Sequence, residues 1–161
     1  MRVWKDADGR QVDDEAIYAW IASERSKFDG DYELIVGTDS HLHGHRYRFV
    51  SVVCIYRKGR GGFYYYTVSE QDRKEFKGTY PVRVRARMFH ETTLTIELAT
   101  EIQERAGRAP VIHIDASPPE TGEVTSLFSD QLKGYAISSG FDCEIKPWAF
   151  VSSCIADRHT K

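Results

Sequence analysis

Two aspartates each close a short apolar segment that is typical of a buried strand, and carboxylates in such positions suit metal chemistry. Asp39 lies near the end of Leu34-Ile-Val-Gly-Thr-Asp39-Ser40, and Asp115 ends Val111-Ile-His-Ile-Asp115. If the two strands are neighbours in one sheet, both carboxylates lie at the same edge of that sheet. Carboxylate oxygens are ligands for hard cations, so we expect a metal site at this edge.

A third carboxylate, Glu91, belongs to a long helix that we expect between Pro81 and about Gly107. Leu94, Leu98 and Ile102 define the apolar face of this helix, and Glu91 lies ~20° from Leu98 around the axis. Burying a lone carboxylate is costly, so an inward Glu91 needs either a shared cation or a salt bridge to an arginine. The outer side of the helix carries three glutamates that we expect to face solvent, Glu97, Glu101 and Glu104.

The fourth carboxylate, Asp157, lies in a last helix that we expect from Ala149 to Lys161. In an α-helix, Asp157 shares a face with the residues three, four and seven positions before it, which are Cys154, Ser153 and Phe150. That face can point toward the sheet. Lys161, four residues on, can lie on the same side and contact a phosphate, whereas His159 is turned ~200° away.

Histidines surround both strand-end aspartates. His41, His43 and His45 follow Asp39, and three histidines could bind zinc or nickel, but an exposed polar hairpin is the favoured interpretation. His41 is a candidate contact for a substrate phosphate. His113 shares one side of its strand with Asp115, and a structural and a functional role are both open.

Basic and aromatic clusters lie between the second strand and the long helix. The basic ones could follow a phosphate backbone or could be solvated loops, and they span residues 57–60, 73–77 and 83–87. Phe63-Tyr64-Tyr65-Tyr66 could stack on bases. Strand alternation favours packing instead, with Phe63 and Tyr65 on one face of the sheet and Tyr64 and Tyr66 on the other.

The elements that must position these residues alternate in type along the chain. Asp13 can cap a first helix running to about Lys27, with an apolar stripe that ends at Glu24. Short loops then link three strands into an antiparallel meander. The expected strands span residues 33–38, 47–57, 62–69, 111–115 and 141–147, and the helices between the later strands span 81–107 and 126–139.

These motifs together resemble those of the YkuK family of predicted RNase H-like nucleases, over nearly the whole chain. The resemblance rests on Gly37-Thr-Asp39-Ser40, on the inward Glu91 and on His113-Ile-Asp115, and above all on Ile145-Lys-Pro147 followed by Ala156-Asp157-Arg-His159. It implies an α/β fold of the RNase H-like type. Such a fold has a five-stranded mixed sheet, its first three strands antiparallel, flanked by helices, here with an added N-terminal helix.

The resemblance also implies roles for individual residues. Asp39, Glu91, Asp115 and Asp157 would be the catalytic and metal-binding carboxylates. They would hold two Mg²⁺ or Mn²⁺ ions ~4 Å apart, one activating water and the other stabilising the leaving oxygen during phosphodiester hydrolysis. The candidate substrate-binding residues are Ser40, His41, Lys146 and Lys161.

The expected function is therefore that of a metal-dependent nuclease, acting on RNA, DNA or an RNA–DNA hybrid. A noncatalytic nucleic-acid-binding module on the same scaffold is the alternative, although clustered negative charge does not suit a pure binding surface for phosphates. An actin-like ATPase is disfavoured, because neither a second related domain nor a GxxxxGK[ST] phosphate loop is present.

Composition sets the outer limits of these expectations. A chain of 161 residues with 41% apolar and 29% charged residues is an ordinary soluble composition, and we expect one domain over residues 1–161, with residues 1–30 as an N-terminal arm and helix. The net charge of −2 argues against indiscriminate nucleic-acid binding.

No apolar stretch approaches the ~20 residues of a membrane helix, and the charged start is unlike a signal peptide, so we expect a cytoplasmic protein without membrane contact. Three unpaired cysteines suggest neither a disulfide framework nor a zinc site.

Overall fold

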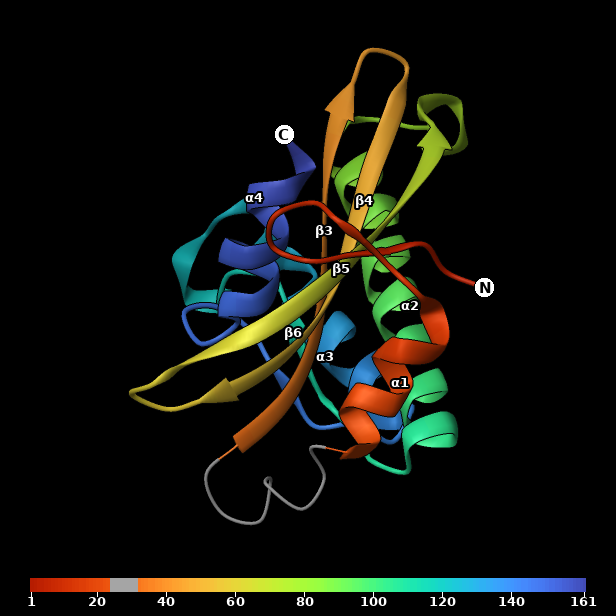
Figure 1. The fold of residues 1–161 in the computed structure, drawn as a ribbon. Coiled ribbons are helices and arrows are strands. Elements are labelled where there is room, and N and C mark those ends of the chain that lie inside the picture. The colour runs from red at the N-terminus through yellow and green to blue at the C-terminus, as the bar shows by residue number, and fades with distance from the viewer. Residues whose placement is uncertain (24–31) are drawn as a thin grey trace.

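Three long strands rich in β-branched and aromatic residues form the centre of the molecule (Figure 1). They are β3 (Tyr32–His43), β4 (Arg46–Arg57) and β5 (Gly61–Asp72), paired antiparallel in sequence order. The computed structural model describes residues 1–23 and 32–161. The predicted meander is present, but its strands are longer than expected, because β3 continues to His43 and turns at Gly44, whose φ is 59°.

The sheet contains seven strands in the order β2-β1-β5-β4-β3-β6-β7, so the prediction of five strands was wrong. Five of these strands have the expected arrangement: β6 (Val111–Ile114) pairs parallel with β3, and β7 (Cys143–Glu144) pairs parallel with β6. The two extra strands are β1 (Trp4–Lys5) and β2 (Gln11–Val12). They form a hairpin that pairs with the outer edge of β5. The sequence here is compatible with a strand or an extended arm that turns at Asp8-Gly9, and the structure has the strand.

Helices cover both faces of the sheet (Figure 1). On one face, α1 (Asp14–Ser23), α2 (Tyr80–Ala106) and α3 (Ser129–Ser138) bury a core that includes Ile17, Leu98 and Leu132. The added N-terminal helix is therefore present, although its predicted end near Lys27 and its stripe residue Glu24 lie outside the described residues. Short 3₁₀ turns lead into α2 and α3, and they span Arg73–Glu75 (η2), Pro119–Thr121 (η3) and Val124–Leu127 (η4).

The opposite face is covered by the C-terminal helical segment, which differs from the predicted α-helix. Residues Val151–Ala156 (η5) form a π-helix, and only Asp157–Thr160 (α4) is an α-helix. The wider turn changes which residues share a face, so Ser152 and Ala156 are buried, whereas Cys154, which was expected beside Asp157 on the inward face, is exposed.

The close approach of this segment to the sheet depends on a glycine in β3. A Cβ atom on Gly37 would lie 3.0 Å from the backbone nitrogen of Ser152 and 3.1 Å from its Cβ. Gly37 lies two residues before Asp39 and therefore on the same face of the strand. The missing side chain thus lets the C-terminal segment pack beside Asp39.

The long helix α2 has the boundaries that its sequence signals predict. Thr79 precedes it, Pro81 occupies its first turn, and Gly107 ends it in the left-handed conformation with a φ of 72°. No helix in the described parts of the chain is long and apolar enough to span a bilayer.

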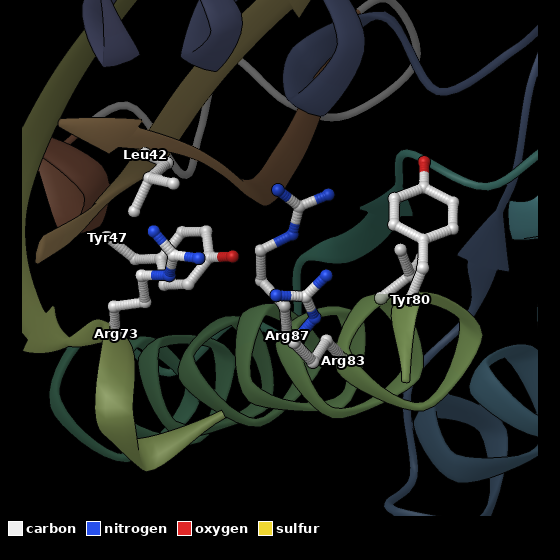
Figure 2. A pocket seen from close by; sticks show the side chains of 7 residues that line it. Leu42, Tyr47, Arg73, Tyr80, Arg83 and Arg87 are labelled. Atoms are coloured by element: carbon white, nitrogen blue, oxygen red, sulfur yellow. The ribbon is translucent and has the colours of Figure 1, made fainter. Parts of the chain in front are cut away.

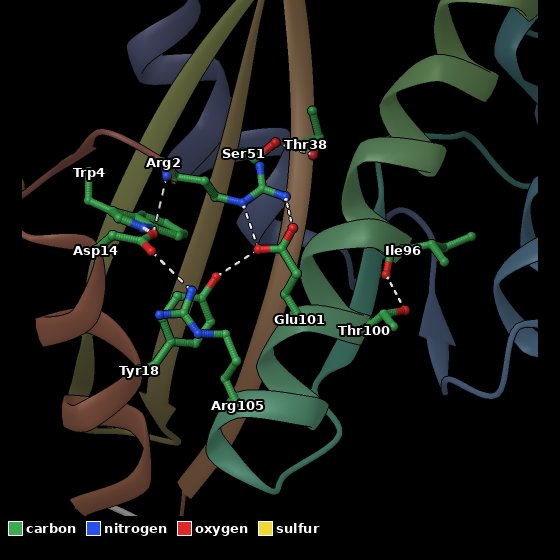
Figure 3. Close-up of polar contacts among 10 residues, drawn as sticks. All are labelled: Arg2, Trp4, Asp14, Tyr18, Thr38, Ser51, Ile96, Thr100, Glu101 and Arg105. Carbon is green, nitrogen blue, oxygen red and sulfur yellow. Dashed lines mark hydrogen bonds and ion pairs between the residues drawn. The ribbon is translucent and has the colours of Figure 1, made fainter.

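A polar cluster fastens the N-terminal hairpin and α1 to the far end of α2 (Figure 3). The buried Asp14 accepts hydrogen bonds from the indole nitrogen of Trp4, at 3.0 Å, and from Arg105, also at 3.0 Å. Glu101 accepts from Arg2, at 2.9 Å, and from the Tyr18 hydroxyl, at 2.9 Å. Glu101 is therefore half-buried in a network, and the expectation that it faces solvent was wrong.

Replacing Asp14 should test how much this cluster stabilises the fold. In Asp14→Ala the buried indole N–H of Trp4 loses its acceptor, so we expect the free energy of unfolding to fall by about 2–3 kcal/mol, measured by urea denaturation. Glu15→Ala is the matched control, because Glu15 contacts the same Arg105 from an exposed position and should change little. Equal losses in the two variants would contradict a specific role for the buried acceptor.

Candidate functional site

The register between two parallel strands places two of the four predicted carboxylates next to each other, although Asp39 lies inside β3, which continues to His43, and not at the strand end that the sequence predicted. Thr38 of β3 is paired with Ile114 of β6. Asp39 and Asp115 are the next residues along the chain, and they lie side by side as the sequence predicted. Asp39 is 8% exposed, and the side chain of Asp115 is 21% exposed. Desolvation by burial, followed by the charge of Asp115, raises the pKa of Asp39.

Glu91 belongs to α2, which covers the face of β3 opposite to the C-terminal segment, and its side chain reaches the same region as Asp39. It is buried, as the helical spacing predicted, and its Oε1 accepts a hydrogen bond of 2.5 Å from the Ser40 hydroxyl. Its pKa is raised by burial and by the charges of Asp39 and Asp115. Ser40, a predicted substrate contact, is itself buried, and in this structure its hydroxyl orients Glu91.

A salt bridge between Glu91 and an arginine was the alternative explanation for an inward glutamate. Among the described residues, no basic side chain forms an ion pair with Glu91. Arg87, one helical turn earlier, contributes an attraction that acts to lower the pKa of Glu91, but burial and the other carboxylates dominate. Two buried acids, Asp39 and Glu91, are thus left with only partial compensation of their charge.

The fourth carboxylate, Asp157, begins α4, which packs against β3 and β4. Its negative charge acts to raise the pKa of Asp39, so the π-helical turn still brings it toward the cluster. The four predicted side chains therefore converge from two strands and two helical segments. Their roles as metal ligands and catalytic groups stay a prediction.

The two predicted substrate-binding lysines form ion pairs with carboxylates of the cluster. Lys146 Nζ lies 2.9 Å from Asp115 Oδ1, and Lys161 Nζ lies 3.1 Å from Asp157 Oδ2. Burial acts to lower the pKa of Lys146, but the hydrogen bond and the charge of Asp115 raise it overall, so the ammonium form is favoured. These two cations offset part of the negative charge on the exposed side of the cluster.

The histidines near the carboxylates have structural contacts. His113 is buried, and its Nδ1 accepts a hydrogen bond from the backbone N–H of Val151, which anchors the C-terminal segment. Burial lowers the pKa of His113 to about 4. His43 Nε2 is hydrogen-bonded to the carbonyl of Thr160, whereas His41 is exposed and packs edge-on against His43, with 5.3 Å between ring centroids.

The aromatic stretch of β5 follows the predicted alternation. Tyr65 packs against Trp20 on the face of α1, whereas Tyr66 stacks on His159 on the opposite face, with 3.9 Å between ring centroids. Tyr64 hydrogen-bonds the same histidine. Phe63 is exposed. Packing therefore accounts for the three tyrosines.

The donor set fits hard divalent cations, although the side-chain positions do not form a complete binding site. In residues 1–23 and 32–161, no group of three or more His, Cys, Asp or Glu side chains has the arrangement of a metal site. The convergent oxygen ligands and the buried acids without an ion-pair partner nevertheless suit Mg²⁺ or Mn²⁺, whereas the described histidines do not form a zinc site.

One polar connection in the site was not found from the sequence. Thr95 of α2 donates to Thr38 of β3 at 2.8 Å, and Thr38 is hydrogen-bonded to Ser51 of β4 at 2.9 Å. Thr95 is one turn after Glu91 and Thr38 directly precedes Asp39, so this chain of hydroxyls fixes α2 against β3 beside both acids. The only sequence signal was the spacing of four residues between Glu91 and Thr95.

Comparison with known proteins gives a family assignment. A family model described as Ribonuclease H-like matches residues 15–161. Searches of curated proteins and of solved structures returned no match. The match includes all four carboxylates and leaves out only the N-terminal hairpin and its flanking residues.

The raised pKa of the buried acids leads to a prediction about stability without metal. Asp39 and Glu91 stay protonated in the folded protein at pH values where the carboxyl groups of the unfolded chain, with a pKa of about 4, have already lost their protons. Their contribution to the free energy of unfolding therefore falls as the pH rises above about 4. Removing the charge in Glu91→Gln should therefore raise the free energy of unfolding relative to wild type, by roughly 1–3 kcal/mol more at pH 8 than at pH 5.

Urea denaturation in EDTA at both pH values measures this difference. His113 acts in the opposite direction, because its lowered pKa makes the folded state lose stability as pH falls, so the comparison with wild type is essential. Glu97→Gln is the control on the exposed side of the same helix. A difference between Glu91→Gln and wild type that does not change with pH would contradict the raised pKa of Glu91.

Proposed function

Because the chain belongs to the ribonuclease H-like family, we propose that it is a metal-dependent nuclease that hydrolyses phosphodiester bonds in nucleic acid. The observation that carries this proposal is the pair of buried acids Asp39 and Glu91. Burial raises the pKa of both, the charges of Asp115 and Asp157 add to this at Asp39, and the charges of Asp39 and Asp115 add to it at Glu91. A structural sheet edge has no need of four converging acids, because each adds a cost of burial or repulsion.

Two Mg²⁺ or Mn²⁺ ions held by these four carboxylates would activate water and stabilise the leaving oxygen. Asp39 is the acid whose pKa is raised by the charges of both Asp115 and Asp157, and we propose that it would share in binding the cations. Ser40 orients Glu91, and the hydroxyl chain from Ser51 to Thr95 keeps α2 at a fixed distance from β3. The protein thereby presents an arrangement of oxygen ligands that is set before substrate binds.

Lys146 and Lys161 have two roles in this proposal. In the structure they neutralise Asp115 and Asp157 from the exposed side. When divalent cations compensate those carboxylates, the ammonium groups become available to contact substrate phosphates. His41 is exposed at the same end of β3 and is proposed as a further phosphate contact.

A noncatalytic nucleic-acid-binding module is the second candidate, and the same two ion pairs favour it. With Asp115 and Asp157 already neutralised by lysines, the scaffold can persist without a cation. The uncompensated Asp39 and Glu91 argue for the nuclease. Membership of the YkuK family and a cytoplasmic location are part of the proposal as well. The former is supported by the motif Ile145-Lys-Pro147 followed by Ala156-Asp157-Arg-His159.

Cleavage assays should separate the two candidates. We expect wild-type protein to cut at least one of labelled RNA, DNA, RNA–DNA hybrid and four-way junction in Mg²⁺ or Mn²⁺, and not in EDTA. Asp115→Asn should reduce the rate at least about 100-fold, because loss of one ligand removes several kcal/mol of transition-state stabilisation.

Glu97→Gln is the control for this assay, because it removes one carboxylate from the exposed side of α2 and should leave the rate unchanged. Binding of nucleic acid by folded protein, with no cleavage of any substrate in either metal, would favour the noncatalytic module and contradict the nuclease.

Metal binding has a readout that does not depend on cleavage. We expect Mn²⁺ at 100 times its dissociation constant to stabilise wild-type protein by about 2.7 kcal/mol in urea denaturation, because the cation binds only the folded state. Asp39→Asn should abolish this increase, and His41→Ala should retain it. The reverse pattern would indicate that the histidine turn holds the metal.

A further inference from the structure

A basic pocket lies at the beginning of α2, on the side of the helix that faces the ends of β3 and β4 (Figure 2). It has a volume of about 290 Å³. Figure 2 shows the side chains of Arg73, Arg83 and Arg87 projecting to one side of the helix, with Tyr80 at one end. The remaining lining residues are Leu42, Tyr47 and Val84.

The three guanidinium groups lack acidic partners. Among the described residues, no carboxylate forms an ion pair with Arg73, Arg83 or Arg87. The Nε atom of Arg87 is also buried without any hydrogen-bond partner. Arg73 is exposed, and the guanidinium of Arg87 lies over the Tyr47 ring, 5.5 Å from its centroid. The buried Nε of Arg87, beside two further cations in one pocket, indicates an anionic ligand.

The pocket is electrostatically connected to the carboxylate cluster. Arg87 acts to lower the pKa of both Asp39 and Glu91, so its charge is felt by the acids while its guanidinium lines the pocket. A polyanion bound across both sites would meet arginines on one side and metal-binding carboxylates on the other. Arg87 is one helical turn before Glu91, and Leu42 is three residues after Asp39 in β3, so the pocket adjoins the two buried acids and is placed to hold a part of the substrate beside them.

The number of arginines distinguishes between two kinds of phosphate. An internal phosphodiester carries one negative charge, whereas a terminal phosphomonoester carries ≈ −1.5 to −2 at pH 7 and offers three acceptor oxygens. Guanidinium groups bind such oxygens in bidentate pairs, and three of them match a dianion better than a monoanion.

We propose that the arginine pocket binds the terminal phosphomonoester of a nucleic-acid strand. This inference rests on the proposed nuclease function only for the statement that the ligand is a nucleic acid. The preference of the pocket for a phosphate follows from its own arginines. The dimensions agree, because about 290 Å³ suits one nucleotide unit rather than a long groove. Tyr80 is 60% exposed at the rim, where its ring can stack on the terminal base.

Binding to matched oligonucleotides tests the proposal without any cleavage. The protein is Asp115→Asn, and the probes are labelled single strands of one sequence with a 5′-phosphate, a 3′-phosphate or hydroxyl groups at both ends. Fluorescence anisotropy should show that one phosphorylated strand binds about 10-fold tighter than the hydroxyl strand, because charge-assisted hydrogen bonds to the extra charge are strong.

The variants identify the pocket as the source of the preference. Arg73→Gln combined with Arg83→Gln should reduce the ratio between phosphorylated and hydroxyl strands to near one. Arg85→Gln is the matched control from the same helix, because Arg85 is exposed, hydrogen-bonds Gln131 and stacks over Phe89 outside the pocket. Circular dichroism and thermal melting verify that each variant is folded.

Each result decides the question. A preference for either phosphorylated end that is lost only in the double variant supports the proposal and names the end. Equal binding of phosphorylated and hydroxyl strands, or an unchanged preference in the double variant, overturns it. Tighter binding of a free nucleoside monophosphate than of any strand overturns the assignment to a strand end.

Failure of the nuclease proposal is separable from failure of this one. An end preference without metal-dependent cleavage would leave the pocket assigned and the catalytic role rejected. Metal-dependent cleavage that is lost in Asp115→Asn, together with no preference for a phosphorylated end, would support the catalytic role and reject the assignment of the pocket.

Discussion

The parallel pairing of β3 with β6 is the constraint on which the candidate site depends. Pairing of Thr38 with Ile114 places Asp39, which lies inside β3, beside Asp115, which directly follows the last residue of β6. A shift of one residue in this register would move one carboxylate to the other face of the sheet. The antiparallel strands β4 and β5 support β3 from its other side, and the buried hydroxyls of Thr38 and Ser51 hydrogen-bond across the β3–β4 pair beside Asp39. The central strands of the sheet therefore position the carboxylates of the candidate site.

The acids at this edge differ in burial, and the less buried ones are those with a basic partner. Asp39 and Glu91, the most buried acids, have no basic partner at ion-pair distance among the described residues, whereas Asp115 and Asp157 are paired with lysines at the surface. Arg83 and Arg87 of the neighbouring pocket lie on the helix that carries Glu91, and Arg73 lies in η2, yet none of the three forms an ion pair with a described acid. Asp39 and Glu91 are thus separated from these arginines, whereas Asp115 and Asp157 are paired with lysines. This separation costs stability and is explained if cations bind one group and phosphates bind the other.

The N-terminal and C-terminal segments are both attached to the central sheet and its helices. The N-terminal hairpin extends the sheet beyond β5, and the cluster around Asp14 and Glu101 fastens it to the far end of α2. The C-terminal segment packs closely against Gly37, where a Cβ atom would lie 3.0 Å from the backbone nitrogen of Ser152, and His113 accepts a hydrogen bond from the backbone of this segment. The first attachment stabilises the fold far from the acids, and the second holds Asp157 beside them. The two attachments therefore have different consequences for function.

The sequence by itself determined the elements with strong local signals. Apolar runs predicted the main strands, Pro81 and Gly107 marked the ends of α2, and helical spacing showed that Glu91 faces inward, because each of these signals depends only on nearby residues. Only the tertiary structure decided the rest. The hairpin of β1 and β2 is too short to be recognised without β5, and the π-helical turn before Asp157 has no periodic signature. Glu101 was expected to face solvent because its partners, Arg2 and Tyr18, are more than eighty residues away in the chain. The ion pairs of the lysines and the convergence of Arg73 with Arg83 and Arg87 likewise depend on distances that exist only after folding brings separate elements together.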